Sequence, residues 1–216
     1  MGEDGSGSND VTGIVDGRHH VPLSTHDDLD AASAYGWALI ARGVTDRKSA
    51  FHTPVVATLG LDGGPEVRTV VLRGADLERW AVRFHTDRRS GKVAALTASP
   101  RIAMHFYCAR SKVQLRLNGV ATLHSDDANA EIAWRNSRPM SRACYAQTRA
   151  PGAAVAEPAL GAASDAKGEE FGRANFVAVE VAVQRFEWLY LAFGGHRRAE
   201  FVRDDQGLVT SRWLAP

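Results

Sequence analysis

Apolar residues recur at helical spacing in the segment from residue 27 to residue 42. The apolar positions are Leu29, Ala32, Trp37 and Ile40. This spacing predicts a helix with one apolar face that packs against a core. Thr25 and Asp27 are candidate N-terminal caps, and Gly43 predicts where the helix ends.

Most of the remaining chain alternates between apolar and polar residues, as strands with one buried face do. The predicted strands cover residues 55–61, 67–73, 80–86, 102–108, 113–124, 176–183, 188–193, 199–204 and 209–213. An Asp-Gly turn at residues 62–65 joins the first two into a hairpin. Short helices are predicted after Ser90 and after Ser125-Asp126, the second running through Trp134 and stopped by Pro139. Many strands with only short helices between them favour an antiparallel barrel, because parallel strands need longer crossovers.

The length of the chain, 216 residues, suits one domain with its own core. Residues 1–24 show no periodicity and are rich in Gly, Asp and Ser. We therefore expect a flexible N-terminal segment at 1–24 and a single folded domain at 25–216. Residues 150–168 are rich in Ala, Gly, Pro and Glu, which predicts a mobile loop or a short exposed helix.

Composition and charge argue against several classes of function. Hydrophobic residues make up 44% of the chain, charged residues 24%, and the formal net charge is +1. Nucleic-acid-binding domains carry a clear basic excess, so no nucleic-acid partner is expected. No apolar run is long enough for a membrane span, and the first residues lack the order of a signal peptide. Cys108 and Cys144 predict neither a disulfide framework nor a metal site, and the His19-His20 pair is no metal site either. A reducing cytoplasm is the expected location.

Four segments carry candidate chemistry, and the first is the strand Arg68-Thr69-Val70-Val71-Leu72-Arg73. It has a cation at each end of an apolar run. Its backbone N–H and C=O groups can meet the edge of a flat ring, while Arg68 reaches a phosphate. Taken alone, the segment is more typical of an edge strand with solvated arginines.

The second segment leads from a strand into a helix and reads His85-Thr86-Asp87-Arg88-Arg89-Ser90-Gly91-Lys92. Helix N-termini present free N–H groups and a partial positive charge, so they bind anions. Lys92, one turn into the helix, can complete a phosphate cradle. The segment lacks the Walker pattern, and by itself it is more typical of a capped helix with a solvated basic face.

Two further polar segments follow. Gln114 interrupts an alternating strand, and its amide can both donate to and accept from the polar edge of a heterocycle. Ser137-Arg138-Pro139 and Gln147-Thr148 come after the second predicted helix. Each segment alone has a simpler interpretation, namely a solvent-facing glutamine and an ordinary polar turn.

The order and spacing of these four segments resemble the pyridoxamine 5′-phosphate oxidase family. The chain shares further motifs with it in Glu187-Trp188, His196-Arg197-Arg198 and the C-terminal Trp213-Leu214-Ala215-Pro216. The resemblance extends from about residue 51 to the C-terminus. It implies a flavin-binding split β-barrel that works as a homodimer and holds FMN in a cleft between its two subunits.

The resemblance also implies roles for individual residues. Arg68 and Lys92 bind the FMN phosphate, and Ser90 shapes the loop beside it. The main chain of Val70, Val71 and Leu72 lines the isoalloxazine ring. The other implied flavin-binding residues are Thr69, Arg73, His85 and Thr86 beside the flavin, Gln114 at the pyrimidine edge, Gln147 and Thr148 at the phosphate end, and Arg198 near the flavin. Some of them serve the partner subunit's FMN.

The chain departs from the family pattern at several positions. Gly91 stands where the family has an arginine, Arg73 where it usually has lysine, and Leu189 where it has tryptophan. The substrate-binding Arg-Leu-His becomes Gly194-Gly195-His196, so one cation that would hold pyridoxamine phosphate is missing. Losing such a contact, about 1.5–3 kcal/mol, weakens binding of a small anion by roughly tenfold to a hundredfold.

These features predict an FMN-dependent oxidoreductase that acts on a small-molecule redox substrate, with the substrate unassigned. Two alternatives stay open: the genuine pyridoxamine 5′-phosphate oxidase, and a flavin- or haem-binding protein without turnover. No catalytic nucleophile–base pair can be nominated. His85 and His196 lie inside the motifs, and a structural or flavin-contacting role suits each better than proton transfer.

Overall fold

The computed structural model describes residues 14–15, 18–19, 21, 25, 27–156 and 168–216. The predicted flexible segment 1–24 lies mostly outside the described residues. Within it, β1 (Ile14–Val15) pairs with β2 (Arg18–His19). Residues 157–167 of the predicted loop lie outside as well. Among the described residues, no helix is both long enough and apolar enough to cross a membrane.

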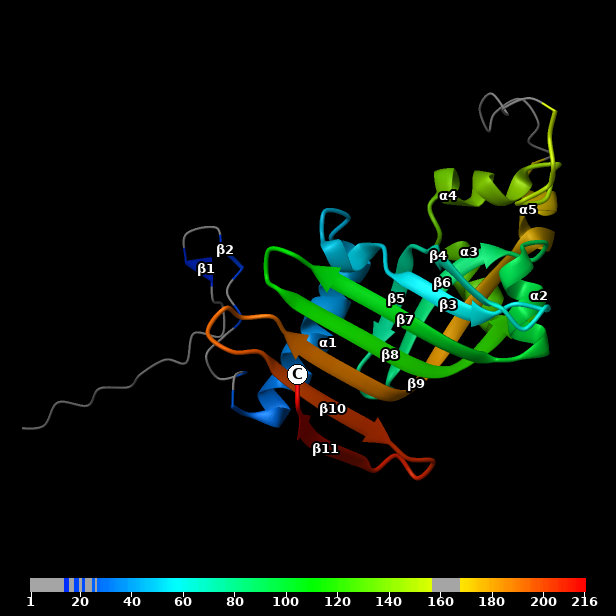
Figure 1. Cartoon of the computed structure of the whole chain (residues 1–216). Helices are drawn as coiled ribbons and strands as arrows, with labels where there is room; N and C mark the ends of the chain where they lie inside the picture. Colours follow the sequence, from blue (N-terminus) through cyan, green and yellow to red (C-terminus); the bar gives the residue numbers. More distant parts are fainter. Residues whose placement is uncertain (1–13, 16–17, 20, 22–24, 26, 157–167) are drawn as a thin grey trace, which may run out of the picture.

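Nine antiparallel strands form the main sheet, as the alternating pattern predicts (Figure 1). The strands are β3 (Val55–Leu59), β4 (Pro65–Thr69), β5 (Leu72–Asp76), β6 (Ala81–Asp87), β7 (Arg101–Cys108), β8 (Val113–His124), β9 (Phe176–Tyr190), β10 (Arg197–Arg203) and β11 (Val209–Leu214). Their order across the sheet is β11-β10-β9-β8-β7-β3-β4, while β6 pairs with both β9 and β5.

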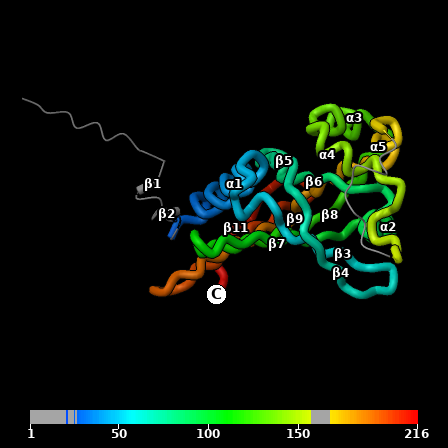
Figure 2. Tube along the Cα trace, turned by 90° about the horizontal axis from the view of Figure 1, so that it is seen from above, coloured from blue at the N-terminus to red at the C-terminus, as the bar shows by residue number. Residues whose placement is uncertain are grey.

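The helices surround this sheet. They are α1 (Leu29–Thr45), α2 (Gly91–Ala98), α3 (Ala128–Arg135), α4 (Pro139–Ala143) and α5 (Glu169–Asn175), with 3-10 turns η2 (Ala50–His52) and η3 (Cys144–Ala146). Figures 1 and 2 both show α2 to α5 toward one end of the barrel, away from α1. Pro139, predicted to end a helix, instead begins α4, where its missing N–H costs no hydrogen bond.

Helix α1 differs from its prediction at both ends. Asp28, rather than Thr25 or Asp27, caps it, because Asp28 Oδ1 accepts a hydrogen bond from Ala31 N–H at 2.7 Å. The helix also continues past Gly43 to Thr45. A Cβ at residue 43 would lie 2.5 Å from the Phe51 carbonyl oxygen. Gly43 therefore permits close packing of η2 and does not end the helix.

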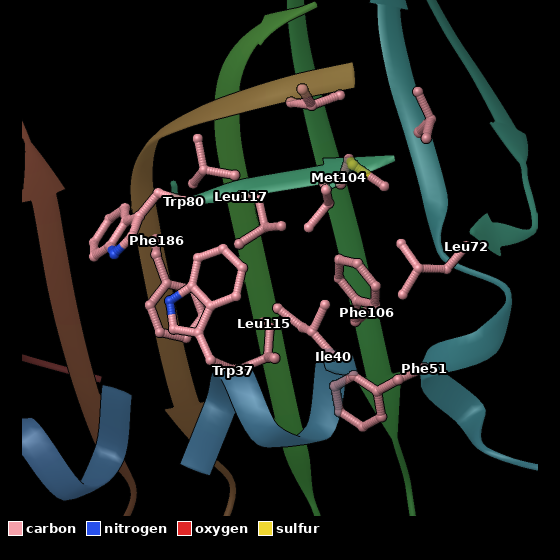
Figure 3. Packing of buried hydrophobic residues seen from close by; sticks show 14 of the residues in the cluster. Trp37, Ile40, Phe51, Leu72, Trp80, Met104, Phe106, Leu115, Leu117 and Phe186 are labelled. Carbon is pink, nitrogen blue, oxygen red and sulfur yellow. The ribbon is translucent and has the colours of Figure 1, made fainter. Parts of the chain in front are cut away.

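The apolar face of α1 packs against the buried side chains of the strands and completes the core (Figure 3). Trp37 lies against Trp80 and Phe186, with ring centroids 5.8 and 5.9 Å apart. Phe51 stacks on Phe106 at 5.8 Å. Burial of these large apolar side chains is the main term that stabilises the barrel.

The predicted strand at residues 67–73 is wrong, because the chain breaks there into β4 and β5. Val70 and Val71 belong to neither strand, and Val70 N–H donates to the Pro54 carbonyl at 3.0 Å. Since β4 pairs with β3 and β5 pairs with β6, this segment crosses from one part of the barrel to the other. The alternation of apolar and polar residues along the chain does not show where the chain changes the strand that it pairs with.

The two predicted strands at 176–183 and 188–193 are one strand, β9. Its first half pairs with β6 and its second half with β10, while β8 runs along nearly all of it. The register shifts between Asn118 and Gly119. A Cβ at residue 119 would lie 2.1 Å from the Ala182 carbonyl oxygen, so only glycine fits this close approach. The irregularity lies where β9 changes partners, and bulges of this kind bend a sheet.

Candidate functional site

Four of the predicted site residues meet beside the N-terminus of α2. Arg68 comes from β4, Thr86 from β6, Ser90 from the loop before α2, and Lys92 from the first turn of α2. Lys92 Nζ donates to Thr86 Oγ1 at 3.0 Å, and Thr86 Oγ1 lies 3.3 Å from Ser90 Oγ. Thr86 and Ser90 are buried. We call these four residues the α2 cluster.

The α2 cluster is electrostatically suited to an anion. Burial lowers the pKa of the Lys92 amine, and the nearby charge of Arg68 lowers it further, with Asp87 acting in the opposite direction. The charges of these two cations repel each other, and a bound dianion would reverse that effect. The residues present therefore fit a phosphate group.

Arg68 is already oriented within this cluster. Its Nη1 donates to Thr58 Oγ1 at 2.7 Å, and its Nη2 lies 2.5 Å from Glu66 Oε2. The sequence interpretation assigned no role to Thr58. The contact of Thr58 with Arg68 could have been inferred from the predicted hairpin, because Thr58 and Glu66 face each other across its two strands.

An ion pair between Arg89 and Asp87 stabilises the loop before α2. The simpler interpretation of the sequence gave this segment a solvated basic face. Arg89 N–H and Nη2 lie 2.8 Å from Asp87 Oδ1 and Oδ2, and Asp87 is buried. Arg89 Nη1 also donates to the Thr148 carbonyl at 3.2 Å. This contact places the Thr148 carbonyl beside the loop before α2, and the role of Gln147 and Thr148 at a phosphate stays a prediction. Ser90 begins α2 without using its hydroxyl as a side-chain cap.

His85 occupies the other face of β6. Its Nδ1 lies 3.4 Å from Ser137 Oγ, and its ring meets the edge of Phe176 at 4.8 Å between centroids. Because the Ser137 hydroxyl donates to the Ala133 carbonyl, Nδ1–H of His85 must be the donor in the His85–Ser137 contact. Nε2 is then an acceptor, buried and without a hydrogen-bond partner among the described residues.

Burial lowers the pKa of His85 to about 3, and the charges of Arg83 and Arg73 contribute to the shift. The ring is therefore neutral near pH 7 and is poorly suited to accept a proton. Arg73 lies at a bulge of the β5–β6 pair, where the register shifts between Leu72 and Gly74. Bulges redirect side chains, and this one places Arg73 within electrostatic reach of His85.

The segment at residues 69–72 offers mainly its backbone. Leu72 is fully buried in the core and Val70 is 8% exposed, so neither side chain can reach a ligand freely. Thr69 is exposed at the end of β4, and Val71 is half-buried between the strands. The use of main-chain groups at residues 70–72 to line a ring stays a prediction.

Gln114 and Arg198 lie apart from the α2 cluster, on the face of the sheet that points away from the core. The register aligns Gln114 with Leu189 and Leu189 with Arg198, across β8, β9 and β10. The neighbouring Leu115 points to the core. By contrast, Arg68 shares the inward face of its hairpin with its register partner Val56. The predicted residues thus form two groups on opposite faces of the sheet.

A cavity of about 540 Å³ lies elsewhere, between the end of α1 and the β7–β8 turn. Its lining includes Arg42, Lys48 and Arg110 but none of the predicted site residues. Within the described ranges, no group of three or more His, Cys, Asp or Glu residues could hold a metal ion.

Comparison with known proteins identifies a family. A family model described as the FMN-binding domain of pyridoxamine 5′-phosphate oxidase matches residues 36–125. The pyridoxine/pyridoxamine 5′-phosphate oxidase of Gluconobacter oxydans (strain 621H) is 31% identical over 186 residues, which cover 82% of this chain and 92% of the relative. The protein of the same name from Alkalilimnicola ehrlichii is 38% identical over 104 residues. That match spans about half of each protein, 48% and 49%.

A solved structure shares the fold. It is a pyridoxamine 5′-phosphate oxidase-related FMN-binding protein from Nostoc punctiforme PCC 73102, with a TM-score of 0.67 and 22% identity. The match covers 84% of this chain and 96% of the other. The predicted fold, a mainly β split barrel with peripheral helices, is confirmed.

The buried neutral state of His85 predicts a pH-dependent stability. The folded pKa of about 3 lies below the ordinary value of 6.5, so between these values the unfolded state binds more protons. The free energy of unfolding should therefore fall as the pH drops from about 6.5 toward about 3, by up to ~1.4 kcal/mol per pH unit.

Equilibrium urea unfolding of the wild type and His85→Gln at about pH 7 and about pH 5 checks this. The difference in unfolding free energy between the two proteins should shift in favour of the variant at the lower pH. A difference that does not change with pH would contradict the assignment of His85 as buried and neutral.

Proposed function

The chain belongs to the pyridoxamine 5′-phosphate oxidase family and its cofactor is FMN, and from this premise we propose that it is an FMN-dependent oxidoreductase acting on a small molecule. FMN supplies the redox chemistry, while the protein binds and orients the cofactor and substrate. The two free cysteines, Cys108 and Cys144, support a reducing cytoplasm as its location.

The α2 cluster is the observation that carries this proposal. It holds Arg68 and Lys92 together with two buried hydroxyls, at the start of a helix whose first N–H groups point toward an anion. This is the chemistry that a phosphate monoester requires. We assign the FMN phosphate to it, with Gln147-Thr148 beside it through Arg89.

For the ring, we propose that the main chain of Val70 to Leu72 borders the isoalloxazine, with His85 and Arg73 nearby. Neutral His85 offers an unpaired acceptor at Nε2 rather than a positive charge. Gln114 and Arg198 lie on the opposite face of the sheet from the inward-pointing Arg68. A second copy of the chain can supply that outer face to the same flavin, which supports a homodimer.

The substrate is expected to differ from pyridoxamine 5′-phosphate. Gly194 and Gly195 stand where the family carries a substrate-binding arginine and leucine. A Cβ at residue 194 would meet nothing within 4 Å, and Gly195 has a φ of +126°. A Cβ at residue 195 would lie 3.3 Å from Arg197 Nη1, so the guanidinium of Arg197 borders this part of the chain. The alternatives are the genuine oxidase and a flavin- or haem-binding protein without turnover.

Turnover with pyridoxamine 5′-phosphate tests the substrate proposal. We expect little hydrogen peroxide release by the wild type, and a KM lower by roughly tenfold to a hundredfold in Gly194→Arg, since the added cation restores about 1.5–3 kcal/mol of phosphate binding. Gly194→Ala is the matched control and should behave as the wild type. Steady peroxide release by the wild type at low substrate concentration would favour the genuine oxidase. Bound FMN that neither NADH nor NADPH reduces would favour a protein without turnover.

Arg68→Ala tests the phosphate assignment. Removing a cation from a partly buried phosphate should cost about 2–4 kcal/mol, which lowers FMN affinity by roughly thirty- to a thousandfold. Riboflavin, which lacks the phosphate, should bind the wild type more weakly than FMN does, and the variant should lose much of this preference. Flavin retention after dialysis and fluorescence titration measure both.

Arg79→Ala is the control for Arg68→Ala. Arg79 lies in the turn after β5, its side chain is 65% exposed, and it pairs with Glu180 at 2.9 Å. An exposed pair of this kind contributes little to stability. If Arg68→Ala retains FMN as well as Arg79→Ala does, the α2 cluster is not the phosphate site.

The homodimer predicts a mass near twice 23.3 kDa in sedimentation at micromolar concentration. Val55, Val67 and Tyr107 are exposed apolar residues that share the outer face of β3, β4 and β7. Val67→Glu should weaken both the dimer and FMN binding, because it places a charge in the proposed interface. Leu208→Glu, at a similarly exposed position in the β10–β11 turn, should do neither. A wild-type protein that sediments only as a monomer would refute the dimer.

A further inference from the structure

Two buried carboxylates lie side by side on the outer face of the sheet, where β9 and β10 pair. Glu187 and Glu200 are register partners, and they are 2% and 3% exposed. A carboxylate that loses its water is stable in a fold only where cations and hydrogen-bond donors replace that water. The side chains around Glu187 and Glu200 must therefore supply these cations and donors.

Arginines from four strands surround the two carboxylates. Glu200 accepts from Arg185 Nε and from Arg212, whose Nε and Nη2 lie 2.8 and 2.6 Å from Glu200 Oε1. Arg185 also links the two acids, with its Nη2 2.8 Å from Glu187 Oε1. Arg116 Nη1 lies 3.6 Å from Glu187 Oε2. The network thus crosses the sheet from β8 to β11.

Arg198 is the member of this network that also belongs to the proposed flavin site. Its Nε and Nη2 both donate to Glu187 Oε2, at 3.0 and 2.6 Å. The third guanidinium nitrogen, Nη1, takes no part in this pair, and the side chain is 27% exposed. Glu187 therefore holds Arg198 by one edge of its planar group and leaves another edge on the outer face of the sheet.

We propose that Glu187 is a positioning residue for the flavin. It fixes the guanidinium of Arg198 on the outer face of the sheet, in register with Leu189 and Gln114, so that the remaining N–H groups meet a flavin bound there. Arg185, two residues earlier on β9, also pairs with Glu187. This inference rests on the proposed function, which places Arg198 at the flavin.

The physical basis is the loss of side-chain freedom. A free arginine side chain has a large rotamer entropy, which a ligand must overcome if it orders the side chain itself. When Glu187 orders Arg198 in the folded protein, the flavin binds a donor that is already in place. If the Glu187–Arg198 pair were purely structural, it would join β9 to β10 equally well. Its loss would then not weaken FMN binding through Arg198.

A double-mutant cycle separates these two roles. The FMN dissociation constant is measured by quenching of flavin fluorescence for the wild type, Glu187→Gln, Arg198→Ala and the double variant. Arg198→Ala should weaken FMN binding by roughly tenfold to a hundredfold. Glu187→Gln should weaken it by about tenfold and shift the visible flavin bands, but it should have almost no further effect in the Arg198→Ala background.

Glu200→Gln is the matched control. It removes a carboxylate of the same burial that holds Arg212 in the same way, while Arg198 keeps its own partner. FMN affinity should then change by less than about twofold, even if the melting temperature falls. Should Glu187→Gln fail to fold, Arg198→Lys replaces it, because lysine keeps the charge but cannot make the edge-on pair. This variant should also bind FMN about tenfold more weakly.

The outcomes distinguish the inference from the proposed function. If the fold-losses of FMN affinity in Glu187→Gln and Arg198→Ala simply multiply in the double variant, the positioning role is overturned. Arg198 then still lies at the flavin. Unchanged affinity in Glu187→Gln, or in Arg198→Lys where that variant stands in, would do the same. If Arg198→Ala binds FMN as tightly as the wild type, the placement of Arg198 in the proposed function fails, and the positioning role fails with it.

Discussion

The long strand β9 shares its backbone hydrogen bonds among three partners, and the positions of the candidate flavin residues on β6, β8 and β10 follow from that sharing. Its first half pairs with β6, which carries His85 and Thr86, and its second half pairs with β10, which carries Arg198. Strand β8, with Gln114, runs along both halves. The change of partner lies beside Gly119, where a backbone carbonyl comes too close for any side chain. The barrel strands and the hairpin of β10 and β11 meet at this point.

Sequence patterns predicted those features that depend on local chemistry. Alternation gave β7 and β8 almost to the residue, and the Asp-Gly turn gave the hairpin of β3 and β4. The loop and helix start at Ser90 and Lys92 predicted a phosphate cradle, and the family resemblance joined Arg68 to it. In the structure Ser90 and Lys92 both contact Thr86 at the start of α2, and Arg68 lies within electrostatic reach of Lys92.

The errors arose where tertiary contacts override local pattern. Gly43 looked like a helix end because glycine favours ends, but its role is to let Phe51 approach. Residues 70–71 continue an apolar run, but the chain changes partner strand there. Glu187 entered the sequence prediction only as part of the Glu187-Trp188 motif, with no role of its own. Its importance depends on Arg185 and Arg198, which meet it only through strand register and its burial among arginines.

Two of the arginines in the proposed flavin site, Arg68 and Arg198, differ in how readily a ligand can exchange with their carboxylate partners. Glu66, the partner of Arg68, is half exposed, with 50% of its side chain accessible, so water can solvate it once a phosphate displaces it. Glu187, the partner of Arg198, is 2% exposed, and breaking its pair would leave a buried charge uncompensated. We therefore propose that Arg68 changes partners when a dianion binds, whereas Arg198 keeps its partner and adds contacts. On this proposal the phosphate end of the site is adaptable, while the contact on the outer face is fixed before the ligand arrives.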